Sequence, residues 1–259
     1  MIGRLYLHWG ARYYDHNIFD SKNAYQAGVS LVSEKATLYA NTSRGINYPG
    51  QEGAALATQS GLGSTWRNLT ANEMEHYEIG AKLNPLQGTN IDVNLFHDQV
   101  NNRFVYQIYG PINAYSTGPY HNNGLEASIK QRFNENWLGF ANYTWLDPNV
   151  NNLPYMPKSS FMAGLNGKVG DFKVAIDAQY QSKIWANTQS RVVEWGVTNN
   201  QQVDSFAVVN IRTSYPVPQL GKKGEVFVAV ENLFDEKYEY SPGYTMPGIA
   251  GQVGFSASF

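Results

Sequence analysis

Gly251-Gln-Val-Gly-Phe-Ser-Ala-Ser-Phe259, the last stretch of the chain, alternates between apolar side chains and polar or small ones. Val253, Phe255 and Phe259 fall on one side of an extended chain, and Gln252 falls on the other. Such period-two alternation predicts a β-strand with one apolar and one polar face. Residues 224–231 alternate in the same way, so the two runs predict a β-hairpin.

The same alternation recurs along the whole chain. About twelve runs are present, each roughly ten residues long. A tilted strand needs about 9–11 residues to cross a bilayer. We therefore predict strands at residues 5–13, 25–31, 37–44, 77–83, 90–105, 125–133, 137–146, 161–169, 172–180, 206–215, 224–231 and 251–259.

The connections between these runs alternate between short and long. Short turns are expected at residues 33–35, 85–88 and 134–136, and Gly170-Asp171 is typical of a two-residue hairpin turn. Long loops are expected at residues 45–72 and 183–203, among others. Short turns at one end and long loops at the other are typical of an outer-membrane β-barrel.

The amino-acid composition excludes several classes of protein and of binding site. The net charge of −2 gives no basic patch for nucleic acid, and the absence of cysteine excludes disulfides and thiolate metal sites. A mean hydropathy of −0.41 combined with 14% aromatic residues suits strands that carry apolar side chains on alternate positions. No apolar run is long enough for a transmembrane helix.

Candidate catalytic groups are few, and none forms a known catalytic motif. His97-Asp98 is interpreted as a polar pair near a membrane interface, and Asp15, His16 and Asp20 as ordinary loop polarity. We expect no metal site, no cofactor and no enzymatic activity. Mixed charges are predicted to line a wet barrel interior: Lys82, Lys130, Arg132, Lys173 and Arg212 among Glu78, Glu126 and Asp177.

A short motif before the last run resembles a known family. Asn232-Leu233-Phe234-Asp235, then Tyr238, Pro247-Gly248 and the terminal Phe259, looks like the closing hairpin of TonB-dependent outer-membrane receptors. Many members carry Arg after Pro-Gly, where this chain has Ile249.

Further segments of the chain resemble the same family. Tyr77-Glu78-Ile79-Gly80 is similar to a recurrent Tyr-Glu-x-Gly strand of these receptors. Weaker matches, in the same order as in the family, are Gly10-Ala11-Arg12-Tyr13, Ser43-Arg44-Gly45, Asn123-Gly124-Leu125-Glu126 and Asn142-Tyr143-Thr144.

The resemblance implies an all-β, antiparallel, up-and-down transmembrane barrel. Receptors of this family form 22-stranded barrels with a plugged lumen. Residues 1–259 are expected to supply about twelve C-terminal strands, without the plug, the first strands or an export signal. Implied partners are outer-membrane lipid, the TonB complex acting through the absent plug, the barrel-assembly machinery at the C-terminal strand, and a small metal-complex ligand.

Aromatic side chains in the long loops are the predicted ligand contacts, because they offer large apolar surfaces with few rotors to fix. In related receptors such residues hold a ferric siderophore, haem, cobalamin or a sugar. The candidates are Tyr48, Trp66, Tyr109, Tyr115, Tyr120, Trp185, Trp195 and Tyr244.

Two other interpretations are left open. One is a self-contained twelve-stranded channel or barrel enzyme. The other is a soluble β-rich binding domain, which would bury the apolar faces between two stacked layers.

Overall fold

The computed structural model describes residues 3–50, 55, 65–101, 103–107, 113–117, 119–150, 153, 155–187, 200–221 and 224–257. Within these ranges the chain contains sixteen strands and two short 3₁₀ turns. The strands of the main sheet are β1 (Arg4–Tyr14), β2 (Lys22–Val32), β3 (Ala36–Asn47), β4 (Asn72–Leu83), β5 (Thr89–Val100), β8 (Tyr120–Arg132), β9 (Trp137–Pro148), β10 (Ser159–Val169), β11 (Phe172–Gln181), β14 (Phe206–Pro216), β15 (Glu225–Glu231) and β16 (Ala250–Ser256).

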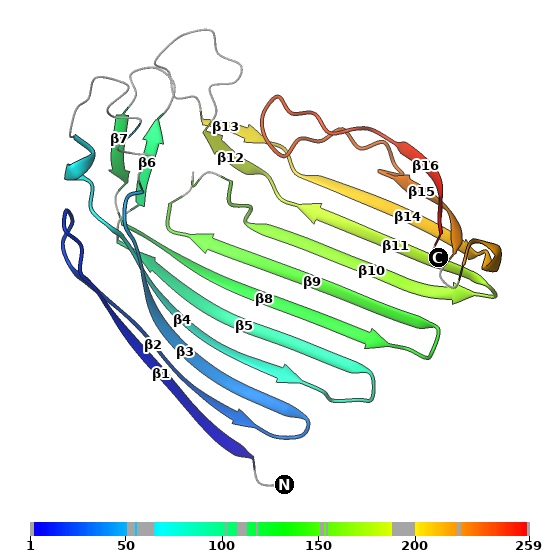
Figure 1. Cartoon of the computed structure of the whole chain (residues 1–259), viewed down its shortest axis with the longest axis horizontal. Coiled ribbons are helices and arrows are strands. Elements are labelled where there is room, and N and C mark those ends of the chain that lie inside the picture. Colours follow the sequence, from blue (N-terminus) through cyan, green and yellow to red (C-terminus); the bar gives the residue numbers. More distant parts are fainter. Residues whose placement is uncertain are drawn as a thin grey trace.

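These twelve strands form one antiparallel sheet in which each strand pairs with the strands of the same sheet that precede and follow it in the sequence. The order is β1-β2-β3-β4-β5-β8-β9-β10-β11-β14-β15-β16 (Figure 1). The predicted all-β, up-and-down meander of about twelve strands is confirmed. Its short turns lie at one end of the strands and its longer connections at the other, called here the turn end and the loop end.

Strand register places the apolar residues on one face of the sheet. A single row of paired positions runs across seven strands, and its members are Leu7, Val29, Ala40, Ile79, Leu95, Leu125 and Trp145. Many side chains of this face are open to their surroundings, including Leu7 at 74% and Val253 at 83% exposure. A contiguous apolar surface of this extent requires an apolar environment such as a bilayer.

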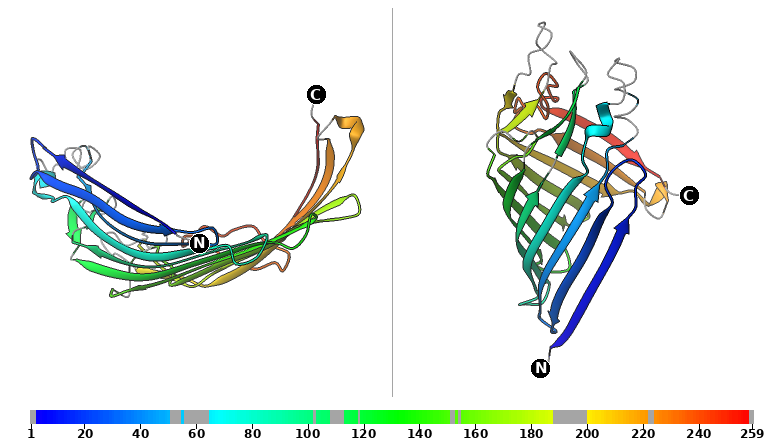
Figure 2. Two further views of the ribbon diagram at one scale, coloured as in Figure 1. Left: turned by 90° about the horizontal axis from the view of Figure 1, so that it is seen from below. Right: turned by 90° about the vertical axis from the view of Figure 1, so that its left-hand side faces the viewer.

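The opposite face is polar, and it lies on the inside of the curve. The sheet bends into a trough with its first and last strands raised on either side (Figure 2). On the polar face large rings lie over glycines: Tyr39 covers Gly80, and Phe96 covers Gly124. A Cβ at either glycine would collide with the ring, so glycine lets side chains crowd together on this concave face.

The sheet is a single open layer. Among the described residues, no second sheet packs against the apolar face. The small cluster of buried residues, Ile184, Ala186 and Val203, lies on the hairpin β12–β13 at the loop end. The interpretation as a soluble two-layer domain is therefore wrong. β1 and β16 form the two edges of the sheet, so the described strands do not close on themselves as a twelve-stranded barrel would.

Two small hairpins at the loop end were not predicted. β6 (Arg103–Gln107) pairs with β7 (Asn113–Thr117), and β12 (Ile184–Asn187) pairs with β13 (Asn200–Val203). The run predicted at residues 90–105 is wrong in its length, because β5 ends at Val100 and β6 belongs to a separate sheet.

The two 3₁₀ turns are η1 (Thr65–Asn68) and η2 (Pro218–Leu220). Across the described residues, no helix combines the length and the hydrophobicity that crossing a membrane would require.

Candidate functional site: the loop end and the concave wall

Two loops meet at the loop end through an aromatic cluster. The loop after β1 supplies His16 and Phe19, and the loop after β3 supplies Tyr48 and Trp66. The His16 and Tyr48 rings stack with centroids 4.7 Å apart, and Phe19 meets Trp66 edge-on at 6.1 Å. These four residues are called the loop aromatic cluster. Two of them, Tyr48 and Trp66, are among the predicted ligand contacts.

Polar contacts hold this cluster in place. The Tyr48 hydroxyl donates to the carbonyl oxygen of Asp20 at 2.9 Å, and burial raises the pKa of that hydroxyl above its ordinary value. His16 Nδ1 accepts from the backbone N–H groups of Ile18 at 3.1 Å and Phe19 at 3.2 Å. The cluster is therefore a fixed platform.

The contacts of Asp15 and His16 agree with ordinary loop polarity and give no support to a cation site in this loop. His16 Nδ1 is occupied by backbone donors, and Asp15 accepts from the Ser21 hydroxyl at 3.0 Å. Within the part of the chain that the structure describes, no three His, Asp or Glu side chains are grouped to hold a metal ion.

An ion triad lies beneath the cluster. Glu73 at the start of β4 is only 7% exposed, and its carboxylate bridges Lys22 on β2 and Arg44 on β3. The Lys22 Nζ to Glu73 Oε1 distance is 2.6 Å, and Arg44 donates to the other carboxylate oxygen. A buried carboxylate needs such partners. The triad ties together the strand ends from which both loops leave.

The motif before the last strand forms a clasp, defined here as Asn232, Asp235, Pro247 and Gly248. Asn232 is 3% exposed and has φ of 50°. Its side-chain amide donates to the carbonyls of Glu236 at 2.8 Å and Pro247 at 3.1 Å, and its Oδ1 accepts from the Glu236 N–H at 2.8 Å. One side chain thus joins both ends of the last long loop.

The remaining clasp residues complete this closure. Asp235 Oδ1 accepts from the Ile249 N–H at 2.9 Å, and a Cβ at Gly248 would collide with the same carboxylate. Tyr238 packs on Phe206 of β14 with ring centroids 4.6 Å apart. Burial, with Tyr240 beside it, raises the pKa of the Tyr238 hydroxyl. The motif therefore has a structural role.

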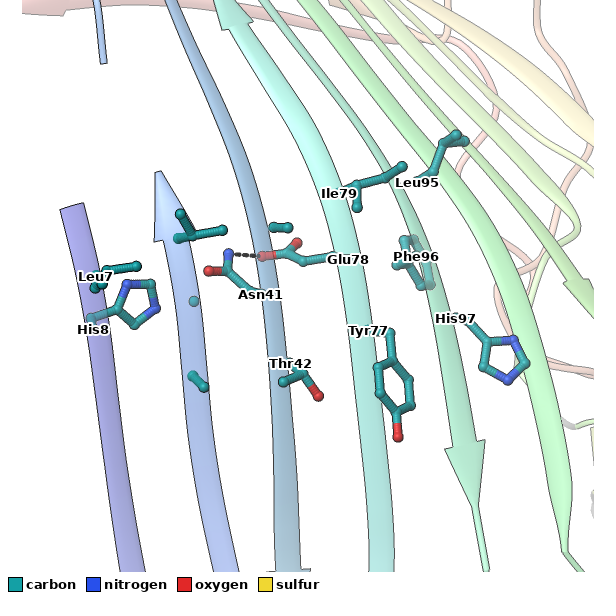
Figure 3. Close-up of a pocket in the computed structure, with 14 residues that line it drawn as sticks. Leu7, His8, Asn41, Thr42, Tyr77, Glu78, Ile79, Leu95, Phe96 and His97 are labelled. Atoms are coloured by element: carbon teal, nitrogen blue, oxygen red, sulfur yellow. Dashed lines mark hydrogen bonds between the residues drawn. The ribbon is translucent and has the colours of Figure 1, made fainter. Parts of the chain in front are cut away.

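A polar network occupies the concave wall from the middle of the strands toward the loop end. Asn41 donates to Glu78 at 2.6 Å, and His76 Nδ1 lies 2.6 Å from Asp98 Oδ1 (Figure 3 shows Asn41 and Glu78). Tyr77 takes the opposite face from Glu78, and Gly80 is the site covered by Tyr39. The Tyr-Glu-x-Gly segment thus alternates between lipid-facing and lumen-facing roles.

His97 and Asp98 do not act as a pair. Asp98 contacts His76 on the concave face, whereas His97 Nδ1 lies 2.8 Å from Asn123 Oδ1 on the other face. Adjacent strand residues point to opposite faces, so a sequence neighbour is not a spatial partner.

An apolar groove of about 780 Å³ crosses β1 to β5 (Figure 3). Most of its lining residues lie on the apolar face, including Ala27 and Val29 on β2 and Ala40 and Thr42 on β3. Residues of the concave-face row also line it, namely His8, Gly28, Asn41, Glu78 and Phe96. This pattern places the groove on the apolar face, where small residues leave a hollow. It is a feature of the lipid-facing surface.

Residues 2–233 match the family model described as TonB dependent receptor-like, beta-barrel. The chain belongs to the TonB-dependent receptor family. This is a family of integral outer-membrane β-barrels that transport without catalysis. The loop end of the receptor sheet is accordingly its extracellular end, and the turn end is periplasmic.

Solved receptor structures share the fold. The siderophore receptor PiuA of Acinetobacter baumannii is 18% identical, with a TM-score of 0.69 over 91% of this chain and 36% of its own. A mutant ferric enterobactin receptor, PfeA of Pseudomonas aeruginosa, is 14% identical, with a TM-score of 0.72 over 98% of this chain and 43% of its own. The iron transporter FrpB of Neisseria meningitidis is 17% identical, with a TM-score of 0.73 over 98% and 43%.

The chain spans well under half the length of these three receptors. At 14–18% sequence identity, the similarity to these receptors shows a shared fold and nothing further. No curated protein matches the chain.

The other predicted ligand contacts of the receptor are scattered along the extracellular end. Tyr120 begins β8, Trp185 lies in β12 opposite Gln202, and Tyr244 is 69% exposed in the last loop. Tyr109, Trp195 and the motif residue Phe259 lie outside the described residues, as does the side chain of Tyr115 on β7. Of the described candidates, Tyr48 and Trp66 are brought into one cluster.

Sequence reasoning missed two members of that cluster, His16 and Phe19. The sequence contained a signal for them, since His16 and Phe19 lie three residues apart in a mostly polar loop, residues 15–22, and such a pair suggests a local anchor. What no local pattern contains is the contact with Tyr48, because it joins two different loops.

Proposed function

We propose that residues 1–259 form the C-terminal part of a TonB-dependent receptor barrel that imports a metal complex. The ligand class proposed is an iron complex, siderophore or haem, or a cobalamin-like molecule bound by the extracellular loops. The names of the similar structures support this class, since they include a siderophore receptor, a ferric enterobactin receptor and an iron transporter.

The observation that carries the proposal is the loop aromatic cluster on the extracellular end of a lipid-facing sheet. Trp66 is half-buried against Phe19, and the Arg67 guanidinium lies 5.3 Å from the Trp66 ring. A rigid aromatic surface beside a cation suits a planar, negatively charged ligand such as a ferric catecholate. Tyr244, more exposed, adds a second aromatic contact from the last loop.

The remaining partners follow from the same proposal. The TonB complex would act through a plug, and the barrel-assembly machinery would read the C-terminal strand. The described residues provide wall and loops, so the proposal assigns them ligand capture and assigns energy coupling to the plug.

Binding can be tested on the refolded chain in lipid nanodiscs. The panel is a ferric catecholate, ferric citrate, haem, cobalamin and Cu²⁺, followed by tryptophan fluorescence. We expect one iron complex or cobalamin to bind, and Trp66→Ala to weaken it about ten-fold, which corresponds to about 1.4 kcal/mol.

The matched control is Trp9→Ala, because Trp9 is 83% exposed on the lipid-facing side of β1. It should leave the dissociation constant unchanged. If no iron complex and no cobalamin binds, the assigned ligand class is refuted. If Trp9→Ala weakens binding as much as Trp66→Ala does, the assigned site is refuted.

Transport is expected to be absent from residues 1–259 alone. In liposomes that contain the inner-membrane TonB complex and an energised membrane, the chain should give no uptake of the bound ligand above protein-free vesicles. The reason is that the proposal places the energy-coupled motion in the plug. Energy-dependent uptake of a radiolabelled ligand by this chain would contradict it.

A further inference from the structure

The concave face carries a basic hollow at its periplasmic end, separate from the loop aromatic cluster. The hollow has a volume of about 470 Å³. Four cationic side chains line it, one each from β8, β10, β11 and β14: Arg132, Lys168, Lys173 and Arg212. Register confirms the face, since Asn166, Ala175 and Arg212 are successive partners across β10, β11 and β14.

The cations of the basic hollow are only partly neutralised. Glu225 accepts from Lys173 at 2.9 Å, from Arg212 at 3.1 Å and from the Ser214 hydroxyl at 3.1 Å. No ion pair joins the side chains of Arg132 or Lys168 to any other described residue. The lining holds four cationic side chains against two carboxylates, Glu135 and Glu225, which leaves two positive charges in excess.

Two of the cations oppose each other directly. Lys168 on β10 and Lys173 on β11 are partners in the antiparallel register. Like charges at directly opposed positions destabilise a sheet. A sequence that breaks a local rule of this kind commonly does so at a functional site. The opposed lysines therefore indicate that an anion from outside the described sheet completes the hollow.

The spread of the cations indicates the size of that anion. From β8 to β14 there are four strand-to-strand steps, or roughly 19 Å at about 4.8 Å per step. A single phosphate or carboxylate cannot reach across this distance, whereas about six residues of extended polypeptide can. Ala175, on the concave face between the cations, has a small side chain that leaves room for a backbone.

We propose that the basic hollow binds the carboxylates of an acidic peptide segment lying across β8 to β14 inside the barrel. Arg132 and Lys168 contact the segment first, since neither is held by a carboxylate of the sheet. Asn166 offers a side-chain amide beside them. The site faces the lumen and not lipid, so its occupant is a polypeptide and not a lipid headgroup.

Fluorescence anisotropy tests this with the refolded chain in uncharged detergent. The probes are a labelled Gly-Glu repeat peptide, its Gly-Gln analogue and inorganic phosphate as a competitor. The Gly-Glu peptide should bind at least about ten-fold more tightly than the Gly-Gln peptide, and added salt should weaken it. Lys168→Glu and Arg132→Glu should each lower the affinity several-fold.

Two measurements separate binding from folding. Lys168→Glu creates an opposite-charge pair with Lys173, so its urea unfolding midpoint should rise while peptide affinity falls. The matched control is Lys130→Glu, on the same face of β8 but outside the hollow, which should leave the affinity within about two-fold.

Three results would overturn the proposal. One is equal binding of the Gly-Gln peptide, and another is a loss in Lys130→Glu as large as in Lys168→Glu. The third is complete displacement by millimolar phosphate, which would define a small-anion site. None of these depends on the ligand panel used for the loop aromatic cluster, so the two proposals fail separately.

Discussion

Replacement of Asn232 by alanine should lower the free energy of unfolding by about 4 kcal/mol, from about 1 kcal/mol for each of three lost side-chain hydrogen bonds and about 1 kcal/mol for a left-handed backbone that alanine resists. Asn232 makes three such hydrogen bonds at φ of 50°, and it is almost fully buried. The measurement is urea unfolding of the refolded chain in detergent micelles, followed by tryptophan fluorescence.

Two further variants dissect this effect. Asn232→Gly accepts the positive φ but loses the hydrogen bonds, so it should retain part of the stability that alanine loses. Asn17→Ala is the matched control, because Asn17 is an exposed loop asparagine. Its effect should stay within about 0.5 kcal/mol. An Asn232→Ala variant as stable as Asn17→Ala would mean that the clasp does not hold the last loop.

Introducing a lysine at Leu95 should cost about 2–4 kcal/mol in a bilayer, because the charge would lie on the lipid-facing side near the middle of the apolar band. Leu95 is paired with Ile79 and Leu125 across β4, β5 and β8, so it has apolar partners on both sides. The readout is the urea midpoint in lipid vesicles together with heat-modifiable mobility on a gel.

The neighbouring residue supplies the control. Asn94 precedes Leu95 on the same strand but faces the lumen, where its amide lies 3.5 Å from the Glu126 carboxylate. Asn94→Lys should therefore change the free energy of unfolding by less than about 1 kcal/mol. Equal destabilisation by both lysines would show that the two faces of β5 do not meet different solvents.

Much of the fold could be predicted because the alternation of side chains reports both the strand and its environment. The run at residues 172–180 became β11 (Phe172–Gln181), and the turn predicted at Gly170-Asp171 carries a φ of 59° at Gly170. These features are local, so a short window of sequence contains the whole signal.

The failures have equally physical causes. β12 and β13 are four residues each, too short for a period to be recognised, and they form because Ile184, Ala186 and Val203 bury one another. The predicted fifth run crossed Asn101 because alternation continued past the point where the ladder with β4 and β8 stops. Pairing, which is non-local, decided that boundary.

The candidate site was only partly accessible from sequence. Aromatic composition picked out Tyr48 and Trp66, but their contact passes through Phe19, which precedes Tyr48 by 29 residues and Trp66 by 47 along the chain. The basic hollow shows the same limit. Arg132, Lys173 and Arg212 were expected to line the lumen, yet the opposition of Lys168 to Lys173 depends on strand register.

The open seams at β1 and β16 bear on how this sheet can enter a membrane. At alternate residues along each seam, the backbone N–H and C=O point away from the sheet and have no partner strand. Hydrocarbon contains no water to hydrogen-bond them, and each unsatisfied group costs several kcal/mol of free energy. A trough whose two seams stay unpaired is thus unstable in the bilayer, so refolding into lipid requires a partner strand at each seam, for example from a second copy of the chain. Insertion of the sheet into the bilayer and pairing of a neighbouring strand with each seam must therefore occur together.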